Sequence, residues 1–237
     1  MMRSAALILV SILAARDLAT AKCAMPSVGS AVITPATAKL PADGGVLVGA
    51  TASFEVQISG ADTALNPTWR FGDGSKELVP VLVTLAPGLV VYRPPAGMTG
   101  ALTLKDGKAE IAKLTVTADK PAALAAPEPH SLVLNKVAER YGGFRLQIDA
   151  KLKTAVPAGA VAIVVLAVTK KGNVPRSWVR VEANATDAQV AGSSGRCDPG
   201  VPGEIMSKAG DKVVLAYVDA YGRLSKPSRP VNIKRGK

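Results

Sequence analysis

The feature that most constrains this fold is a two-residue alternation of apolar and polar side chains. The clearest case is residues 144–153, in which apolar residues alternate with charged or amide residues in the order Phe-Arg-Leu-Gln-Ile-Asp-Ala-Lys-Leu-Lys. Phe54, Val56 and Ile58 repeat the pattern, with polar residues between them. Successive side chains of a strand point to opposite faces, so each stretch predicts a half-buried strand.

A second kind of strand is predicted over residues 160–168, where all nine side chains are apolar. Such a run fits a central strand that is covered on both faces. Asp106-Gly107 lies between two strand-like stretches and predicts a hairpin whose two central residues both take positive φ. Twenty-two Gly and 17 Pro supply further turns. Strands at regular spacing predict an all-β sandwich fold rather than an α/β fold.

The domain boundary is expected in residues 119–131, which read DKPAALAAPEPHS. Three prolines and four alanines without alternation predict a stiff linker. We therefore expect two β-sandwich domains of about 100 residues each. Their expected bounds are 22–118 and 131–237, with the linker at 119–130.

Three segments resemble known modules. Residues 214–228, VLAYVDAYGRLSKPS, are similar to the closing hairpin of fibronectin type III modules, and residues 35–56 resemble the opening of bacterial Ig-like domains. Residues 69–75, WRFGDGS, look like the core of polycystic-kidney-disease-type Ig-like modules. Arg70 stands where that last family carries Asp, so its assignment is not carried over. Together the resemblances imply tandem Ig-like modules of a secreted or envelope protein of bacteria, and they imply no activity.

The first 21 residues have the anatomy of a secretory signal peptide. Arg3 precedes an uncharged run of eleven residues, AALILVSILAA, and Ala19-Thr20-Ala21 offers the small-x-small cleavage site. A membrane anchor is the alternative, but about 20 apolar residues are needed to span a bilayer. A lipoprotein is a further alternative that Lys22, directly before Cys23, disfavours. We expect cleavage before Lys22 and a periplasmic or extracellular protein.

The chain has two cysteines, Cys23 and Cys197. In an oxidising compartment an isolated pair is expected to form a disulfide bond. Zinc binding is a poor alternative, because two cysteines and one histidine do not make a zinc site.

The net charge of +11 is distributed unevenly. Residues 125–237 hold 18 Lys and Arg against 9 Asp and Glu, whereas residues 22–124 hold 9 against 8. A basic half can meet an anionic polysaccharide, lipid headgroups or nucleic acid. Because the charges are spread along the chain, an ordinary solvated surface is the favoured interpretation, and no nucleic-acid partner is expected.

No arrangement of residues predicts catalysis. The single histidine, His130, is expected in the linker among prolines, and Asp73 in Gly-Asp-Gly is expected to be a turn residue. Calcium sites show several acids at alternate positions, and no such run is present. We expect a non-enzymatic protein without a metal or other cofactor.

The two tryptophans differ in their predicted surroundings. Trp69 shares a strand face with Phe71, so it is expected in the core. Trp178 shares a face with Arg180, while Val179, Val181 and Ala183 take the face that is expected to be buried. Trp178 is therefore expected to be exposed beside Arg176 and Arg180. Surface cation–π packing is one interpretation, and contact with a partner is the other.

These inferences lead to an expected function, with an alternative. We expect a non-enzymatic secreted or periplasmic module that binds or assembles with another component of the bacterial cell envelope. The alternative is a carbohydrate-binding or enzyme-accessory protein that uses Trp178 and the basic second domain. An enzyme whose fold brings two carboxylates together is a third and least favoured class. The expected partner is accordingly another envelope protein or an anionic or carbohydrate surface.

Overall fold

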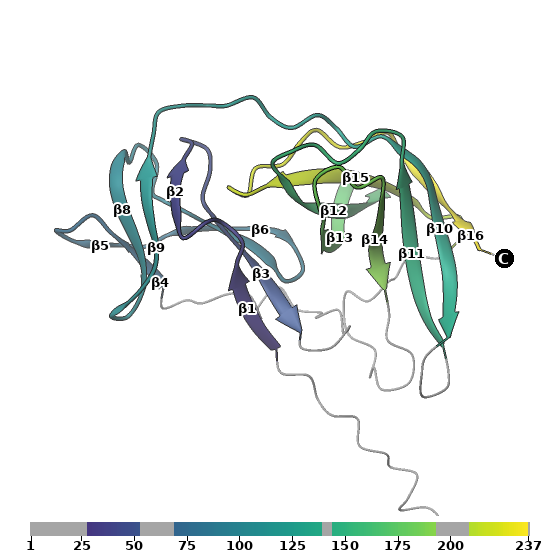
Figure 1. Cartoon of the computed structure of the whole chain (residues 1–237), viewed down its shortest axis with the longest axis horizontal. Helices are drawn as coiled ribbons and strands as arrows, with labels where there is room; N and C mark the ends of the chain where they lie inside the picture. The colour runs from purple at the N-terminus through teal and green to yellow at the C-terminus, as the bar shows by residue number, and fades with distance from the viewer. Residues whose placement is uncertain (1–27, 53–68, 139–143, 193–208, 237) are drawn as a thin grey trace, which may run out of the picture.

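The computed structural model describes residues 28–52, 69–138, 144–192 and 209–236, and within them every regular element is a strand (Figure 1). The described residues contain no helix with the length and apolar character that crossing a bilayer requires. The all-β fold class predicted from the alternation is therefore confirmed. The predicted strand at residues 54–58 lies outside the described residues.

The N-terminal half forms two sheets. A four-stranded sheet has the order β1-β3-β7-β6, and its strands are β1 (Val28–Val32), β3 (Val46–Ala52), β7 (Leu89–Arg93) and β6 (Val81–Ala86). A five-stranded sheet has the order β2-β9-β8-β4-β5, and its strands are β2 (Thr37–Leu40), β9 (Ala109–Val116), β8 (Gly100–Asp106), β4 (Trp69–Gly72) and β5 (Glu77–Leu78).

The two sheets of the N-terminal half enclose an apolar core. Trp69 and Phe71 of β4 are buried in it, as predicted, and the Trp69 ring lies 5.0 Å from the ring of Tyr92 on β7. The core also contains residues from both sheets, namely Leu40, Val46, Val48, Val90, Leu102, Leu104, Ala112, Leu114 and Val116. In β9 the side chains of Ala112, Leu114 and Val116 point into the core and alternate with exposed side chains, which is typical of a strand with one solvent-exposed face.

The C-terminal half is one seven-stranded sheet that folds over on itself at β16. Its order is β13-β12-β15-β16-β10-β11-β14, and its strands are β13 (Gly172–Arg180), β12 (Ala160–Thr169), β15 (Lys212–Asp219), β16 (Val231–Arg235), β10 (Pro129–Ala138), β11 (Phe144–Leu152) and β14 (Asp187–Gly192). The strands on either side of β16 form two wings, β13-β12-β15 and β10-β11-β14, which face each other across a second core. Ile148, Ala150 and Leu152 enter that core from β11, and Ile163 and Val165 enter it from β12.

Two sequence predictions about local structure need correction. In the β8–β9 hairpin Asp106 pairs with Ala109, so Gly107-Lys108 is the two-residue turn, and only Gly107 has positive φ, at 57°. A glycine at the first central position with an ordinary second residue is the pattern of a type II′ turn. His130 lies in β10 rather than in a linker, because β10 begins at Pro129. Proline is tolerated at the first residue of a strand, and a register irregularity follows between Pro129 and Ser131.

A third apolar cluster joins the two halves. It lies between the four-stranded sheet and the β13-β12-β15 wing, which face each other (Figure 1). β12 contributes side chains to two of the three apolar clusters. Its Ile163 and Val165 enter the C-terminal core, while Ala162 and Val164 enter the cluster shared by the two halves. The prediction that this run is covered on both faces is confirmed for residues 160–165, and one of the two covers is the N-terminal half. Val168, near the end of the strand, is 38% exposed.

Candidate functional site

The junction between the two halves is the most elaborate arrangement of side chains in the described part of the chain. Its apolar part is the shared cluster, in which every fully enclosed residue has at most 5% of its surface exposed. The N-terminal half contributes Leu47, Leu85, Ala86, Leu89 and Val91, and the C-terminal half contributes Ala162, Val164 and Val218. Burial of this kind contributes roughly 1.5–3 kcal/mol for each large apolar side chain.

A tight turn at residues 219–223 carries the C-terminal half into this junction. The Asp219 carboxylate shapes the turn, because its Oδ1 accepts the backbone N–H groups of Tyr221 at 2.9 Å and Arg223 at 3.0 Å. Gly222 takes a φ of +71°, which glycine adopts without steric cost. A Cβ atom on Gly222 would lie 2.3 Å from Cγ2 of Val91, so the turn lies in direct contact with β7.

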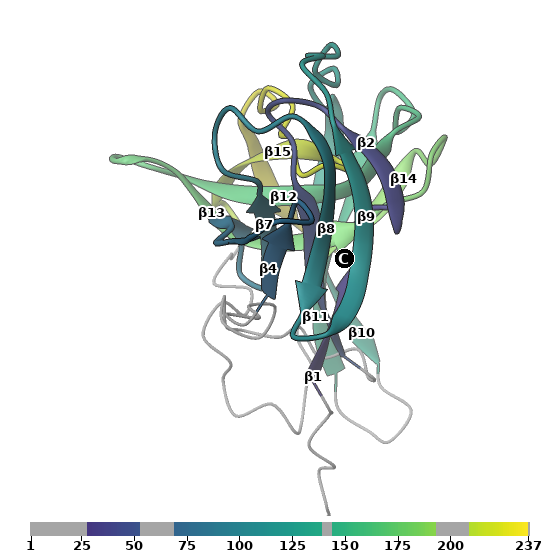
Figure 2. The same ribbon diagram turned by 90° about the vertical axis from the view of Figure 1, so that its left-hand side faces the viewer.

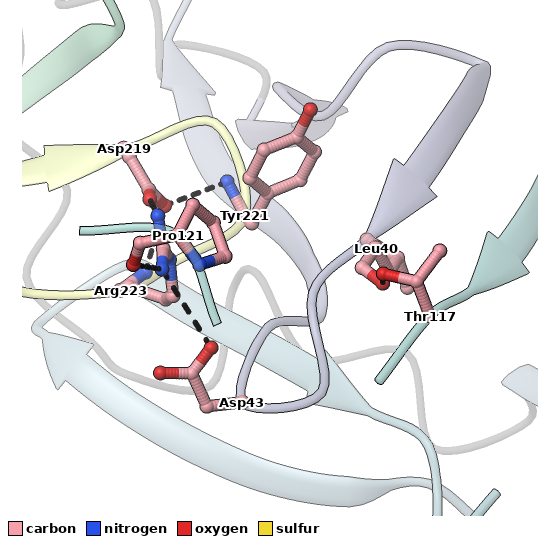
Figure 3. Close-up of polar contacts among 7 residues, drawn as sticks. All are labelled: Leu40, Asp43, Thr117, Pro121, Asp219, Tyr221 and Arg223. Carbon is pink, nitrogen blue, oxygen red and sulfur yellow. Dashed lines mark hydrogen bonds and ion pairs between the residues drawn. The ribbon is translucent and has the colours of Figure 1, made fainter. Parts of the chain in front are cut away.

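Arg223 connects three segments of the chain through its guanidinium group (Figure 3). Its Nε and Nη2 donate to Oδ2 of Asp219 at 2.8 Å and 2.7 Å. Its Nη1 donates to the backbone carbonyl of Pro121 at 2.8 Å and lies 3.7 Å from Oδ1 of Asp43. The Arg223 and Asp219 side chains are only 13% and 8% exposed, whereas Asp43 is 54% exposed. The Asp219 pair is therefore the strong contact, since ion pairs open to solvent contribute little.

Backbone hydrogen bonds fix the same turn to the N-terminal half. Gly45 N–H donates to the carbonyl of Tyr221 at 2.9 Å, and the Thr34 hydroxyl donates to the carbonyl of Ala220 at 2.6 Å. The Thr34 Oγ1 atom also accepts the N–H of Leu47 at 2.8 Å. The ring of Tyr221 packs against the N-terminal core. The carbonyl groups of Ala220 and Tyr221 are thus satisfied by the other half of the protein, as buried groups require.

The segment that follows β9 is held on the N-terminal half before it reaches the junction. Thr117 N–H and its hydroxyl donate to the carbonyl of Leu40 at 2.9 Å and 3.3 Å (Figure 3). The N–H of Ala42 donates to the carbonyl of Asp119 at 3.1 Å. These contacts position Pro121 so that its carbonyl meets Arg223.

Trp178 belongs to this junction, and the expectation that it is exposed is wrong. Its ring is partly buried in the shared cluster, and a Cβ atom on Gly49 of β3 would lie 2.5 Å from Cη2 of Trp178. The strand register is as predicted, because Val179 and Val181 pack on the opposite face against the C-terminal core. The physical reason for the error is that the second face of β13 is covered by the four-stranded sheet, which a local pattern does not reveal.

The two arginines predicted beside Trp178 differ in their exposure. Arg176 is half-buried and Arg180 is exposed. Within the described ranges neither has an ion-pair partner. Their use in partner binding stays a prediction, but the exposed aromatic platform that would have accompanied them is not present.

Removing the Trp178 ring is expected to destabilise the protein markedly. Truncation of a fully buried tryptophan costs about 3–5 kcal/mol, and since this ring is only partly buried we expect Trp178→Ala to cost about 2 kcal/mol. Equilibrium denaturation in urea measures this loss. Gly49→Ala should be less harmful when Trp178 is alanine than when it is tryptophan, because the added methyl group then has space. Equal costs of Gly49→Ala in both backgrounds would contradict this packing.

Two further residues considered for chemistry, Asp73 and His130, are exposed. Asp73 is an exposed turn residue, as predicted, and its Oδ1 accepts the hydroxyl of Ser75 at 2.7 Å and the N–H groups of Ser75 and Lys76. These bonds, the Ser75 hydroxyl first, lower the pKa of Asp73 to about 2. His130 is exposed at the start of β10. In the described ranges no three His, Cys, Asp or Glu side chains gather in a way that could hold a metal ion.

The predicted cysteine bridge cannot be placed, because Cys23 and Cys197 lie outside the described residues. Sequence reasoning missed the Asp219–Arg223 pair. Its only signal was the Asp-Ala-Tyr-Gly-Arg stretch, which resembles a hairpin turn and does not reveal contacts with Asp43 and Pro121. No family model matches the chain, and no curated protein matches its sequence.

Proposed function

We propose that this protein is a non-enzymatic binding or assembly module of the bacterial cell envelope, and that it works as one rigid body. The observation that carries the proposal is the junction. An enclosed apolar cluster and the turn at residues 219–223 fix the two halves in one relative orientation. A preorganised surface loses less conformational freedom on binding than two modules that move independently.

The strand order supports an Ig-like module in the N-terminal half. Its two sheets, β1-β3-β7-β6 and β2-β9-β8-β4-β5, match an arrangement in which strands A, B, E and D face strands G, F and C. The first strand is divided between the two sheets as β1 and β2. When β16 is counted with β13, β12 and β15, the C-terminal half divides into sheets of four and three strands. This division fits the fibronectin type III-like module implied by residues 214–228.

Two buried serines add to that resemblance in the C-terminal half. The hydroxyl of Ser225 accepts the N–H of Tyr217 at 2.9 Å and donates to the carbonyl of Lys226. The hydroxyl of Ser228 does the same between Leu215 N–H, at 3.0 Å, and the carbonyl of Arg229. These serines satisfy the edge of β15 where β16 has not yet begun, which gives a physical role to the serines of the resembling hairpin.

The proposal includes export through cleavage after residue 21 and a Cys23–Cys197 bridge in the exported protein. It favours a protein partner over a carbohydrate. The carbohydrate alternative depended on an exposed ring of Trp178, and that ring is partly buried against Gly49.

A capture experiment with the full exported chain tests this function. We expect immobilised wild-type protein to retain a saturable envelope component. The Arg223→Ala variant should retain less of it at a temperature at which circular dichroism shows its strands intact, because the orientation of the two halves is then less restricted. Asp43→Ala is the matched control, since it removes only the exposed member of the cluster. Turnover of a small molecule by the purified protein, or equal capture by the Arg223→Ala variant, would contradict the proposal.

A further inference from the structure

β6 is an edge strand with unusual exposure of apolar side chains. It ends the order β1-β3-β7-β6, and among the described strands only β7 pairs with it. Val81 and Leu82 at its start are 51% and 43% exposed, and Val79 just before it is 68% exposed. The outward backbone N–H and C=O groups of such a strand are a template for another extended chain.

The protective devices that usually accompany an edge strand are incomplete here. Residues 79–92 contain no charged side chain, whereas natural edges commonly carry lysine or other charges. Pro80 precedes the strand, and a register irregularity lies between Thr84 and Ala86. Between these two limits, residues 81–84 remain as a short, regular and uncharged edge.

A basic hairpin lies next to this edge. Val83 of β6 shares the apolar cluster of the junction with Leu166 of β12 and Trp178 of β13. The far end of the β12–β13 hairpin projects from the body of the protein, at the left in Figure 2. Residues 161–181 contain four cationic side chains and no acidic one, and the cations are Lys170, Lys171, Arg176 and Arg180. Val168 on this hairpin is 38% exposed.

We propose that β6 binds an extended segment of a partner protein, apolar in its middle and acidic at its ends, as an added strand. Main-chain hydrogen bonds to an edge strand give affinity in this mode, and side-chain contacts give specificity. Exposed Val79, Val81 and Leu82 fit the apolar middle, and the hairpin lysines fit acidic ends. The proposal rests on the proposed binding function and names the surface and the chemistry of the partner.

A second copy of this chain is a poorer occupant of the same edge. Each copy carries a net charge of +11, and pairing β6 with β6 would bring two basic hairpins to one place. Like charges brought together at an interface are costly. The charge pattern therefore favours an acidic partner over self-association.

The test uses the full-length exported protein and a labelled synthetic peptide of about eight residues, which is the length of a strand. The peptide alternates valine and threonine and has glutamates at both ends, and a second peptide has lysines instead. We expect the acidic peptide to bind about tenfold more tightly in fluorescence anisotropy, with a difference that shrinks as salt is added. Hydrogen exchange should slow at the amides of β6. A peptide with a central proline should bind weakly.

Matched variants locate the contact. Val81→Ser combined with Leu82→Ser should lose most of the binding of both peptides, because these exposed side chains contact the added strand but support little of the fold. Leu224→Ser is the control, since Leu224 is similarly exposed, at 42%, and lies outside β6 and the β12–β13 hairpin. Lys170→Gln combined with Lys171→Gln should abolish the preference for glutamate ends. Hydrogen-exchange protection elsewhere, or binding that survives the Val81 and Leu82 substitutions, would overturn the proposal.

Two other outcomes separate this proposal from the proposed function. Self-association that the Val81 and Leu82 substitutions abolish would make a second copy the occupant and would overturn the peptide proposal. If neither peptide binds, and the wild type and the double-serine variant capture the same envelope component equally, the edge proposal fails while the binding function stands.

Discussion

Gly222→Ala is expected to lower the free energy of unfolding by about 3–4 kcal/mol. A φ of +71° costs a non-glycine residue roughly 1–2 kcal/mol. The added Cβ atom would also lie 2.3 Å from Cγ2 and 2.9 Å from Cγ1 of Val91, and both belong to a buried residue of β7. Forcing an extra carbon into a packed core costs typically about 1–3 kcal/mol more.

Gly97→Ala is the matched control for this substitution. Gly97 has a φ of +80°, close to that of Gly222, but nothing lies within 4 Å of the position of its Cβ atom. It should show the backbone cost alone, about 1–2 kcal/mol. Urea denaturation followed by circular dichroism measures both variants. If the two losses are equal, the turn at residues 219–223 does not press on β7.

Arg223→Ala is expected to cost about 2–3 kcal/mol. Removing one partner of a largely buried ion pair leaves the other charge without compensation, a loss of about 3–5 kcal/mol when burial is complete. Here Asp219 keeps two backbone N–H donors on Oδ1, which reduces the cost. The substitution also leaves the carbonyl of Pro121 without its donor, so the segment before β10 should exchange amide hydrogens faster.

Asp43→Ala serves as the control for Arg223. Its side chain is exposed and 3.7 Å from the guanidinium group, so we expect a loss of about 0–1 kcal/mol. Denaturation in guanidinium chloride would mask this electrostatic term, and urea should be used. An Asp43→Ala loss as large as that of Arg223→Ala would mean that the exposed contact, and not the Asp219 pair, holds the junction.

The individual strands were predictable because their signals are local. The alternation in residues 144–152 correctly predicted β11, and Trp69 with Phe71 correctly predicted a buried face on β4. The uninterrupted apolar run at residues 160–168 also predicted coverage on both sides of β12. Each of these inferences depends only on the period of two that strand geometry imposes.

The junction was not predictable, because its contacts join residues that are far apart in sequence. Trp178 was expected in solvent since the alternation of β13 shows one apolar face, and the other face is covered by Gly49 and its sheet. Nothing in the sequence around Gly49 predicts that the ring of Trp178 will pack against it. Arg223 meets Asp43 and the Pro121 carbonyl only after both halves have formed, so no local pattern announces that cluster.

The four-stranded sheet packs against the N-terminal core on one face and against the cluster shared by the two halves on the other, and this position limits the order in which the protein can fold. When β12 and β15 have not yet been synthesised, Leu47, Leu89 and Val91 have nothing to cover them, although the N-terminal core can already form. Transiently exposed apolar surface of this kind promotes aggregation. The growing chain therefore passes through a stage in which the four-stranded sheet exposes apolar side chains on its outer face. Synthesis of about the last 80 residues, which contain β12 and β15, ends that stage.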